Sequence, residues 1–279
     1  MDGSLQPRAR SEPDRRPYSI GPHDGPVAVL LHGLTGSPWD LKPLAEGLAN
    51  AGWRVHAPRQ AGHTDSESLA QTSWQGWYET AEGVVESARR PGQRTLVVGF
   101  SMGSLVALRL AALRPEWLAG LVVLGVPIQQ PRWHIVFAEL LVRLRRASPL
   151  LAARIGHHHK ERSDARSEAM ALRLKNLEDM PYESILELGR LQDEVRPLLP
   201  RIRTPTLVMH GAFDHSAPVE GSARVSQALG ASEVRRVVLT RSYHHVIRDI
   251  EGELACAEIL RFAERARARA GRPEVEVAR

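Results

Sequence analysis

Ser101 has surroundings that are typical of a nucleophile. It stands in the pentapeptide Gly-Phe-Ser-Met-Gly, residues 99–103, after an apolar run that ends at residues 95–98 and before a helical apolar pattern over residues 105–110. A sharp turn between a strand and a helix strains the backbone of such a serine and exposes its hydroxyl group, and flanking glycines let the two elements approach closely. The pentapeptide arises often by chance in a chain with 22 glycines, so the rest of the sequence must support it.

A serine nucleophile needs a base to take its proton and an acid to orient that base, because a free hydroxyl reacts weakly at neutral pH. Asp214 directly follows a later apolar run, and two adjacent histidines, His244 and His245, lie in the segment after a predicted strand at 234–240. If these strands are parallel, all these side chains emerge at the same edge of a sheet as Ser101. The order serine, aspartate, histidine along the chain is that of a known class of catalytic triad.

Two further acids, Glu220 and Asp249, follow the same predicted strands. We interpret both as solvated helix residues, and we interpret Asp214 as the triad acid because of its position directly after its strand. His32 and His63 border loops near the predicted site, where a structural hydrogen-bonding role is the simpler interpretation.

The elements that must position these residues alternate between strand and helix. Continuous apolar runs are typical of strands that are buried on both faces of a parallel sheet. We predict strands at 18–20, 26–31, 53–57, 95–98, 118–124, 205–210 and 234–240, and helices at 41–49, 73–89, 219–229 and 252–268, with another helix directly after Ser101. This alternation predicts an α/β fold, with a mostly parallel central sheet and helices on both of its faces.

The alternation stops between residues 127 and 203, which are helical, rich in arginine and without a convincing strand. An insertion after a sheet strand lies over the place where open α/β sheets bind ligands, so we interpret it as a helical cap. The expected organisation is a flexible tail at 1–16, a core formed by 17–126 and 204–268, a cap at 127–203 and a second flexible tail at 269–279.

Four stretches resemble the α/β-hydrolase superfamily and, within it, the bacterial carboxylesterase and monoacylglycerol lipase group. They are Leu-His-Gly-Leu-Thr-Gly at 31–36, the pentapeptide at 99–103, His-Gly-Ala-Phe-Asp at 210–214 and His-Val-Ile at 245–247. Together they frame residues 26–265. The resemblance implies an α/β-hydrolase fold with a helical cap, and a serine ester hydrolase that acts through an acyl-enzyme.

The resemblance implies Ser101 as the nucleophile, Asp214 as the acid and His245 as the base. His245 is preferred to His244 because it directly precedes the Val-Ile pair that follows the family's histidine. The family usually has glycine or serine before that histidine, where this chain has a second histidine after Tyr243.

The resemblance also implies that the backbone N–H groups of Leu34 and Met102 hold the oxyanion, the second of them at a helix start, where the dipole favours an anion. Ser104 stands where many relatives have a third glycine, and we expect this difference to have little effect.

The predicted reaction is hydrolysis of small carboxylic esters of short to medium acyl chain, with no metal and no organic cofactor. The same triad serves monoacylglycerol lipases, thioesterases and acyltransferases, which remain alternatives. A non-catalytic binding protein with this fold is disfavoured because every catalytic position is filled.

Composition excludes several other classes of function. The formal net charge is +5, but the basic residues are scattered arginines without an aromatic-interleaved patch, so nucleic-acid binding is not predicted. The single Cys256 rules out an internal disulfide and a cysteine-based zinc site. The polar beginning of the chain and the lack of an apolar run of about 18 residues predict a soluble, cytoplasmic protein.

Two segments of the predicted cap invite a binding interpretation. The run His157–His159 is interpreted as solvated, because consecutive helical residues point in different directions and cannot ligate one metal from one face. Residues 133–146 combine apolar and arginine side chains, and we prefer a cap helix over the acyl pocket to a helix that contacts a membrane surface. The sequence gives no signal for an oligomeric state.

Overall fold

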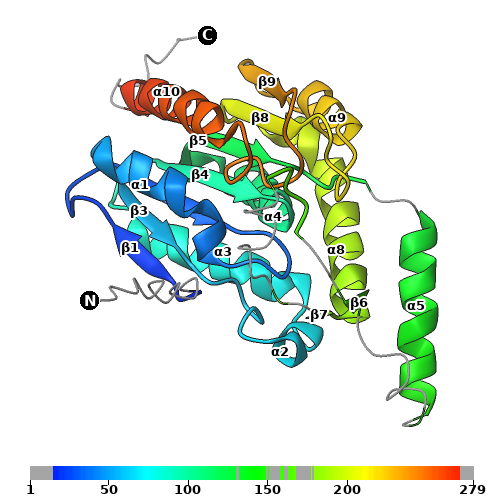
Figure 1. Ribbon diagram of the computed structural model, residues 1–279. Coiled ribbons are helices and arrows are strands. Elements are labelled where there is room, and N and C mark those ends of the chain that lie inside the picture. The colour runs from blue at the N-terminus through cyan, green and yellow to red at the C-terminus, as the bar shows by residue number, and fades with distance from the viewer. Residues whose placement is uncertain are drawn as a thin grey trace, which may run out of the picture.

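The computed structural model describes residues 15–129, 132–148, 150, 158–159, 163–167, 177 and 179–270. Most of the two predicted tails, 1–16 and 269–279, and parts of the predicted cap lie outside these ranges. The described residues form an α/β fold around one seven-stranded sheet (Figure 1), as the sequence predicts.

The sheet has the strand order β1-β3-β2-β4-β5-β8-β9. Its strands are β1 (Tyr18–Ile20), β2 (Val27–Leu31), β3 (Arg54–Ala57), β4 (Thr95–Phe100), β5 (Leu118–Leu124), β8 (Thr206–Gly211) and β9 (Val234–Leu239). All pairings in it are parallel except that of β1 with β3. The central strands β2, β4, β5 and β8 are buried at every residue, which explains their continuous apolar runs.

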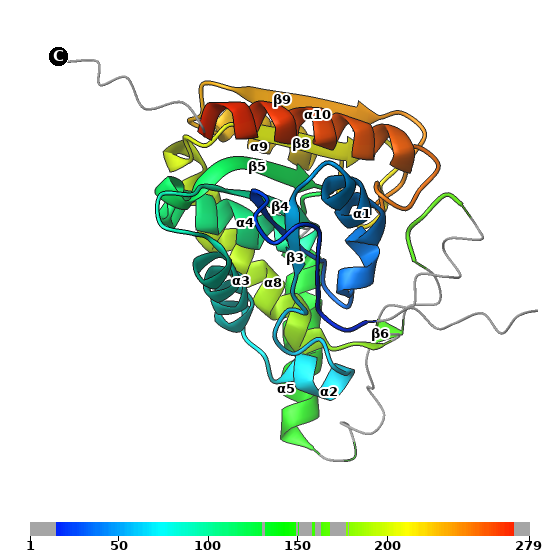
Figure 2. The same cartoon turned by 90° about the vertical axis from the view of Figure 1, so that its left-hand side faces the viewer.

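Helices cover both faces of the sheet (Figures 1 and 2). The α-helices are α1 (Lys42–Asn50), α2 (Ser66–Ala70), α3 (Trp74–Ala88), α4 (Met102–Leu113), α5 (Arg132–Ala147), α8 (Tyr182–Val195), α9 (Glu220–Ala228) and α10 (Gly252–Ala270). Short 3₁₀ helices are η1 (Pro38–Leu41), η2 (Pro115–Trp117) and η3 (Arg196–Arg201). Helices α1 and α10 pack into one core cluster, and α3, α4, α8 and α9 pack into the other. None of the helices in the described ranges is long and apolar enough to cross a membrane.

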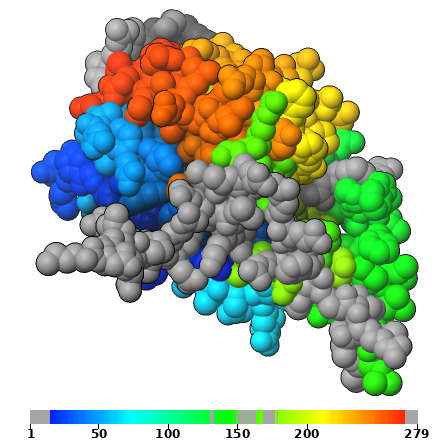
Figure 3. All heavy atoms as spheres, viewed as in Figure 1, coloured from blue at the N-terminus to red at the C-terminus, as the bar shows by residue number. Residues whose placement is uncertain are grey.

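The insertion between β5 and β8 contains two helices with different environments. Leu188, Leu191 and Val195 of α8 belong to the same buried cluster as α3 and α4, so this helix is part of the core layer, although the sequence placed it in the cap. Helix α5 projects from the body (Figure 3) and exposes large apolar side chains, among them Trp133 and Phe137.

Helix α5 contacts α8 closely, since a Cβ on Gly189 would lie 2.8 Å from Ile135 Cδ1. The insertion also contains two short antiparallel strands, β6 (His158–His159) and β7 (Asp179–Met180), which the sequence did not predict. Strands this short bury little surface and carry no hydrophobic period, so their pairing has no sequence signal.

Candidate active site

Ser101 lies on the sharp turn between β4 and α4. Its backbone has φ 53° and ψ −121°, a strained conformation for a residue with a side chain. A Cβ on Gly99 would lie 2.3 Å from Gly103 O, and a Cβ on Gly103 would lie 2.2 Å from Leu31 O. Only glycine fits at both positions, because each meets backbone atoms, and the turn therefore has the shape that the pentapeptide predicts.

Ser104 fixes this turn to the neighbouring strand. Its hydroxyl group is fully buried and lies 2.8 Å from Gly99 O and 2.9 Å from Leu124 O, and it accepts a hydrogen bond from Leu124 N at 3.2 Å. Ser101 N donates to the same Leu124 O at 2.8 Å. The expectation that a serine at this position has little effect took no account of these contacts, which connect the turn to β5.

Asp214 follows β8, and its carboxylate is completely buried. Oδ1 accepts the N–H groups of Ser216 at 2.9 Å and Ala217 at 2.7 Å. Oδ2 lies 2.7 Å from His244 Nδ1 and 2.9 Å from His210 Nε2. Burial by itself raises the pKa of this carboxyl group, but the charge of His244 and the hydrogen bonds from His210 and His244 outweigh it, so the pKa lies well below its ordinary value. Asp214 is therefore an anion at neutral pH.

The histidine that contacts Asp214 is His244, and this corrects the preference for His245. With Nδ1 donating to the aspartate, the His244 ring keeps Nε2 for proton exchange. The neighbouring His245 donates its backbone N–H to Asp164 O at 3.1 Å, and its ring centroid lies 5.0 Å from that of Phe100. Adjacent residues in a turn point in different directions, so only one of the two imidazoles can reach Asp214.

His210 is a site residue that sequence reasoning missed. It is fully buried four residues before Asp214, and its Nε2 lies between Asp214 Oδ2 and the carbonyl oxygen of Ala217, 3.0 Å away. Because both neighbours are oxygens, Nε2 carries the hydrogen and donates it to them, which supports the aspartate. The sequence showed a histidine in the 210–214 stretch but no signal for its direction.

The loop after β2 passes directly beside Ser101. A Cβ on Gly33 would lie 3.0 Å from Ser101 Cβ. The carbonyl oxygen of Gly33 accepts Gly36 N at 3.1 Å and His32 Nδ1 at 2.9 Å, which holds the loop that carries Leu34. Met102 is the first residue of α4, where an N–H group has no acceptor within the helix. The predicted pair of N–H groups thus comes from two elements that meet at Ser101.

His32 and His63 lie beneath this loop as buried, neutral imidazoles. His32 uses both nitrogens, because Nε2 accepts Gln60 N at 3.0 Å and Nδ1 donates to Gly33 O. Burial lowers the pKa of His32 well below its ordinary value. Burial likewise lowers the pKa of His63 to about 4. Neither ring lines the cavity beside Ser101, so both rings contact only the surrounding fold and not the cavity.

We expect the protein to lose stability as the pH falls from about 6.5 toward 4. In the unfolded chain His63 has its ordinary pKa of 6.5, whereas the folded value is about 4, so the unfolded state binds more protons between these limits. The contribution is fully present above pH 6.5 and is lost toward the folded pKa, at about 1.4 kcal/mol per pH unit for each such histidine. Urea unfolding at pH 7 and pH 5 measures this slope. In a His63→Asn variant the free energy of unfolding should change less between these two pH values. An equal change in variant and wild type would contradict the lowered pKa of His63.

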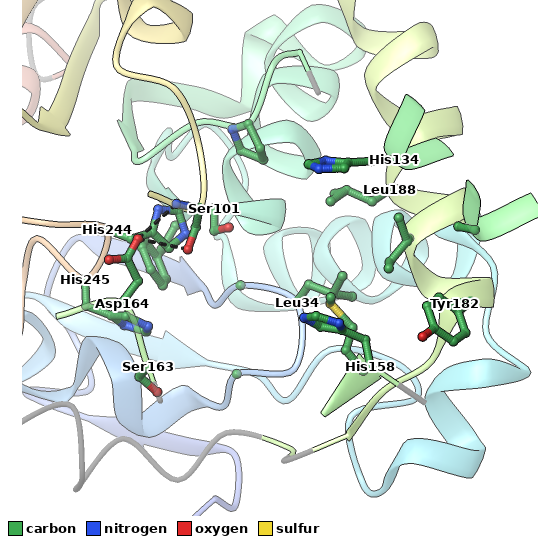
Figure 4. Close-up of a pocket in the computed structure, with 18 of the residues that line it drawn as sticks. Leu34, Ser101, His134, His158, Ser163, Asp164, Tyr182, Leu188, His244 and His245 are labelled. Carbon is green, nitrogen blue, oxygen red and sulfur yellow. Dashed lines mark hydrogen bonds between the residues drawn. The ribbon is translucent and has the colours of Figure 1, made fainter. Parts of the chain in front are cut away.

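A cavity of about 710 Å³ opens beside Ser101 and His244 (Figure 4). Ser101, His244, His245 and Asp164 lie at one end of it in that view. Its apolar lining comes from the loop after β2, from β4, from the segment after β5 and from the insertion: Leu34, Phe100, Pro127, Trp133, Phe137, Ala138, Met180, Ile185 and Leu188. The cavity therefore joins a polar end at the serine turn to an apolar wall.

In the described part of the chain, no group of three or more histidine, cysteine, aspartate or glutamate side chains is arranged to hold a metal ion. His157 of the His157–His159 run lies outside the described residues, and His158 lines the cavity.

A strained serine turn, an aspartate-histidine pair and a loop beside the serine, all at the carboxyl ends of strands in a mostly parallel sheet, define an α/β-hydrolase. Comparison with known proteins gives the family. The chain belongs to the family described as serine aminopeptidase, S33, whose model matches residues 22–251.

Individual relatives span almost the whole chain. The thermostable monoacylglycerol lipase of Bacillus sp. (strain H-257) is 29% identical over 248 residues, which cover 86% of this chain and 91% of that protein. The carboxylesterase of Bacillus subtilis (strain 168) is 23% identical over 252 residues, which cover 90% of this chain and 96% of that protein.

Solved structures agree in fold. A chain from the work described as "LipS and LipT, two metagenome-derived lipolytic enzymes" superposes with a TM-score of 0.78 at 25% identity, covering 92% of this chain and 100% of that one. The monoacylglycerol lipase of Paleococcus ferrophilus superposes with a TM-score of 0.72 at 20% identity, covering 90% and 98%, which supports the fold alone.

Proposed function

We propose that this protein is a serine carboxylesterase that hydrolyses esters of short to medium acyl chain through an acyl-enzyme. The observation that carries the proposal is the Asp214–His244 hydrogen bond of 2.7 Å beside the strained Ser101, at the end of an apolar-walled cavity. The similarity to a lipase and to a carboxylesterase supports ester hydrolysis as the reaction class.

In this mechanism His244 removes the proton from Ser101 Oγ, and the serine oxygen attacks the ester carbonyl carbon. Asp214 stabilises the imidazolium that forms. The N–H groups of Leu34 and Met102 donate to the oxyanion of the tetrahedral intermediate. His244 gives its proton to the leaving alcohol, and the acyl group stays on Ser101. His244 then takes a proton from water as its oxygen attacks the acyl carbon, and it returns this proton to Ser101 Oγ when the bond from the acyl carbon to Oγ breaks and the acid leaves.

Monoacylglycerol lipase activity is the second candidate. It is favoured by the 29% identical relative and by Trp133 and Phe137, which line the cavity and are more than half exposed at 65% and 52%. An apolar entrance of this kind fits a long acyl chain that arrives from a lipid aggregate. Thioesterase and acyltransferase activities would use the same triad, but no observation favours either of them.

Two measurements test these proposals. A fluorophosphonate probe should label the folded protein, and peptide mapping should place the adduct on Ser101; a protein that is not labelled would be a non-catalytic binding protein with this fold. Initial rates on p-nitrophenyl esters of increasing chain length, 1-monoacylglycerols, acyl thioesters and an amino-acid p-nitroanilide then separate the substrate classes. We expect the highest kcat/KM on the shorter esters, and a clear preference for long-chain monoacylglycerols would favour the second candidate.

A further inference from the structure

A short segment of the insertion, residues 163–167, lies against both loops that carry the aspartate and the histidine of the proposed triad. It contacts them through two carboxylates. Asp164 of the segment receives hydrogen bonds from the loop of Asp214, and Asp249 of the histidine loop receives hydrogen bonds from the segment. We refer to Asp164, Asp249 and the groups that they bind as the clasp.

Asp164 holds the loop that follows Asp214. Its Oδ2 accepts His215 N at 2.8 Å, Ser216 N at 2.9 Å and Ser216 Oγ at 3.0 Å, and its Oδ1 lies 3.0 Å from His215 Nδ1. The N–H of Ser216 is shared, because it also donates to Asp214 Oδ1 at 2.9 Å. Asp164 and the triad aspartate therefore lie on either side of one donor, and movement of Asp164 would displace the peptide group that orients Asp214.

The clasp also holds the backbone N–H groups of the two residues that flank His244. The N–H of Tyr243 donates to Asp249 Oδ2 at 2.7 Å, and the N–H of His245 donates to the backbone carbonyl oxygen of Asp164 at 3.1 Å. The other oxygen of Asp249 accepts Arg166 N at 3.0 Å and Ser167 N at 3.1 Å. The backbone on either side of His244 is thus held in part by the 163–167 segment, through the carbonyl oxygen of Asp164 and through Asp249.

Electrostatics argues against an incidental contact. Asp164 is a second carboxylate near the buried Asp214, because both accept the N–H of Ser216, and like charges at short range repel. Asp164 offsets this cost with four hydrogen bonds from two residues, while its side chain is only 14% exposed. A purely structural connection between the insertion and this loop could be made by a neutral side chain.

We propose that Asp164 is a positioning residue for the reaction, which aligns Asp214 and His244 when the 163–167 segment lies on their loops. This rests on the proposed esterase function. Asp164 acts through the two triad residues, so its loss should lower the reactivity of Ser101 toward even the smallest reagents. A displacement of about 1 Å in a catalytic group can cost on the order of a hundredfold in rate.

The test compares Asp164→Ala and Asp164→Asn with Asp193→Ala, a control on α8 whose carboxylate is 72% exposed and pairs only with Arg196 among the described residues. The second-order rate constant for fluorophosphonate labelling of Ser101 reports triad alignment, and kcat and KM are measured with p-nitrophenyl acetate. For Asp164→Ala we expect labelling and kcat to fall about tenfold or more, with KM changed less than about twofold. Asp164→Asn keeps one carbonyl acceptor and should retain an intermediate rate, and the control should match the wild type.

Unchanged labelling and kcat in Asp164→Ala would overturn the proposal, and so would a change confined to KM, since that would place Asp164 in substrate binding. If the alanine variant does not fold, the nearly isosteric Asp164→Asn decides by the same criteria. If the wild-type protein is not labelled at all, both the esterase function and the positioning role are contradicted. If wild type and variant are labelled at equal rates, only the positioning role is contradicted.

Discussion

Replacement of Ser101 by alanine is expected to lower ester hydrolysis by about 10⁴-fold or more, and to abolish labelling by a fluorophosphonate. The reason is that the hydroxyl oxygen forms the acyl-enzyme, and no other serine or threonine among the described residues combines this strained turn with the Asp214–His244 pair. The oxyanion N–H groups stay in place, so a slow residual reaction with bound substrate remains. Steady-state rates on p-nitrophenyl butyrate measure the loss.

The alanine variant should fold as the wild type does. The turn is held by Gly99, Gly103 and the buried hydroxyl of Ser104, none of which changes, and alanine has the same backbone cost at φ 53° as serine. Ser87→Ala, at an exposed site on α3, is the matched control and should keep full activity. Activity above a few per cent in Ser101→Ala, with an unchanged thermal midpoint, would show that another residue is the nucleophile.

The sequence predicted the sheet and the serine turn because both depend on local patterns. The continuous apolar runs of β2, β4, β5 and β8 can be accommodated only in strands that are buried on both faces. Gly99 and Gly103 are required by backbone contacts within a few residues of Ser101 and with the neighbouring β2. Asp214 could be chosen because it directly follows a buried strand.

The sequence could not decide which of His244 and His245 contacts Asp214, because the two residues are adjacent and chemically identical. Their directions depend on hydrogen bonds outside the pair: Tyr243 N donates to Asp249, and His245 N donates to the carbonyl oxygen of Asp164 in the insertion. Asp249 was interpreted as a solvated residue, yet it is buried and accepts hydrogen bonds from the 163–167 segment and from its own loop. Such long-range bonds leave no periodicity for a sequence analysis to detect.

The boundary between the cap and the core could not be predicted from the sequence for the same reason. Helix α8 has an amphipathic pattern that fits either a lid or a core layer, and only its contact with α3 and α4 shows that Leu188, Leu191 and Val195 belong to the core. The arginines and exposed apolar residues of α5 did indicate a helix outside that layer.

Replacement of His244 by alanine is expected to lower kcat by about 10⁴-fold or more, whereas His245→Ala should retain activity within about tenfold of the wild type. His244 is the imidazole on Asp214, so its loss removes the proton acceptor for Ser101 and leaves the buried carboxylate with His210 and two backbone N–H groups. In His245→Ala the backbone N–H that donates to Asp164 O remains, and the ring whose centroid lies 5.0 Å from that of Phe100 is removed.

Chemical rescue distinguishes loss of the base from loss of structure. The alanine at 244 leaves space beside Ser101 in a cavity of about 710 Å³, so added imidazole should enter, take the serine proton and restore part of the rate. The same imidazole should leave His245→Ala unchanged. If His245→Ala were the inactive variant and were rescued while His244→Ala remained active, His245 would be the base after all, and the Asp214–His244 bond would be a resting arrangement that changes when substrate binds.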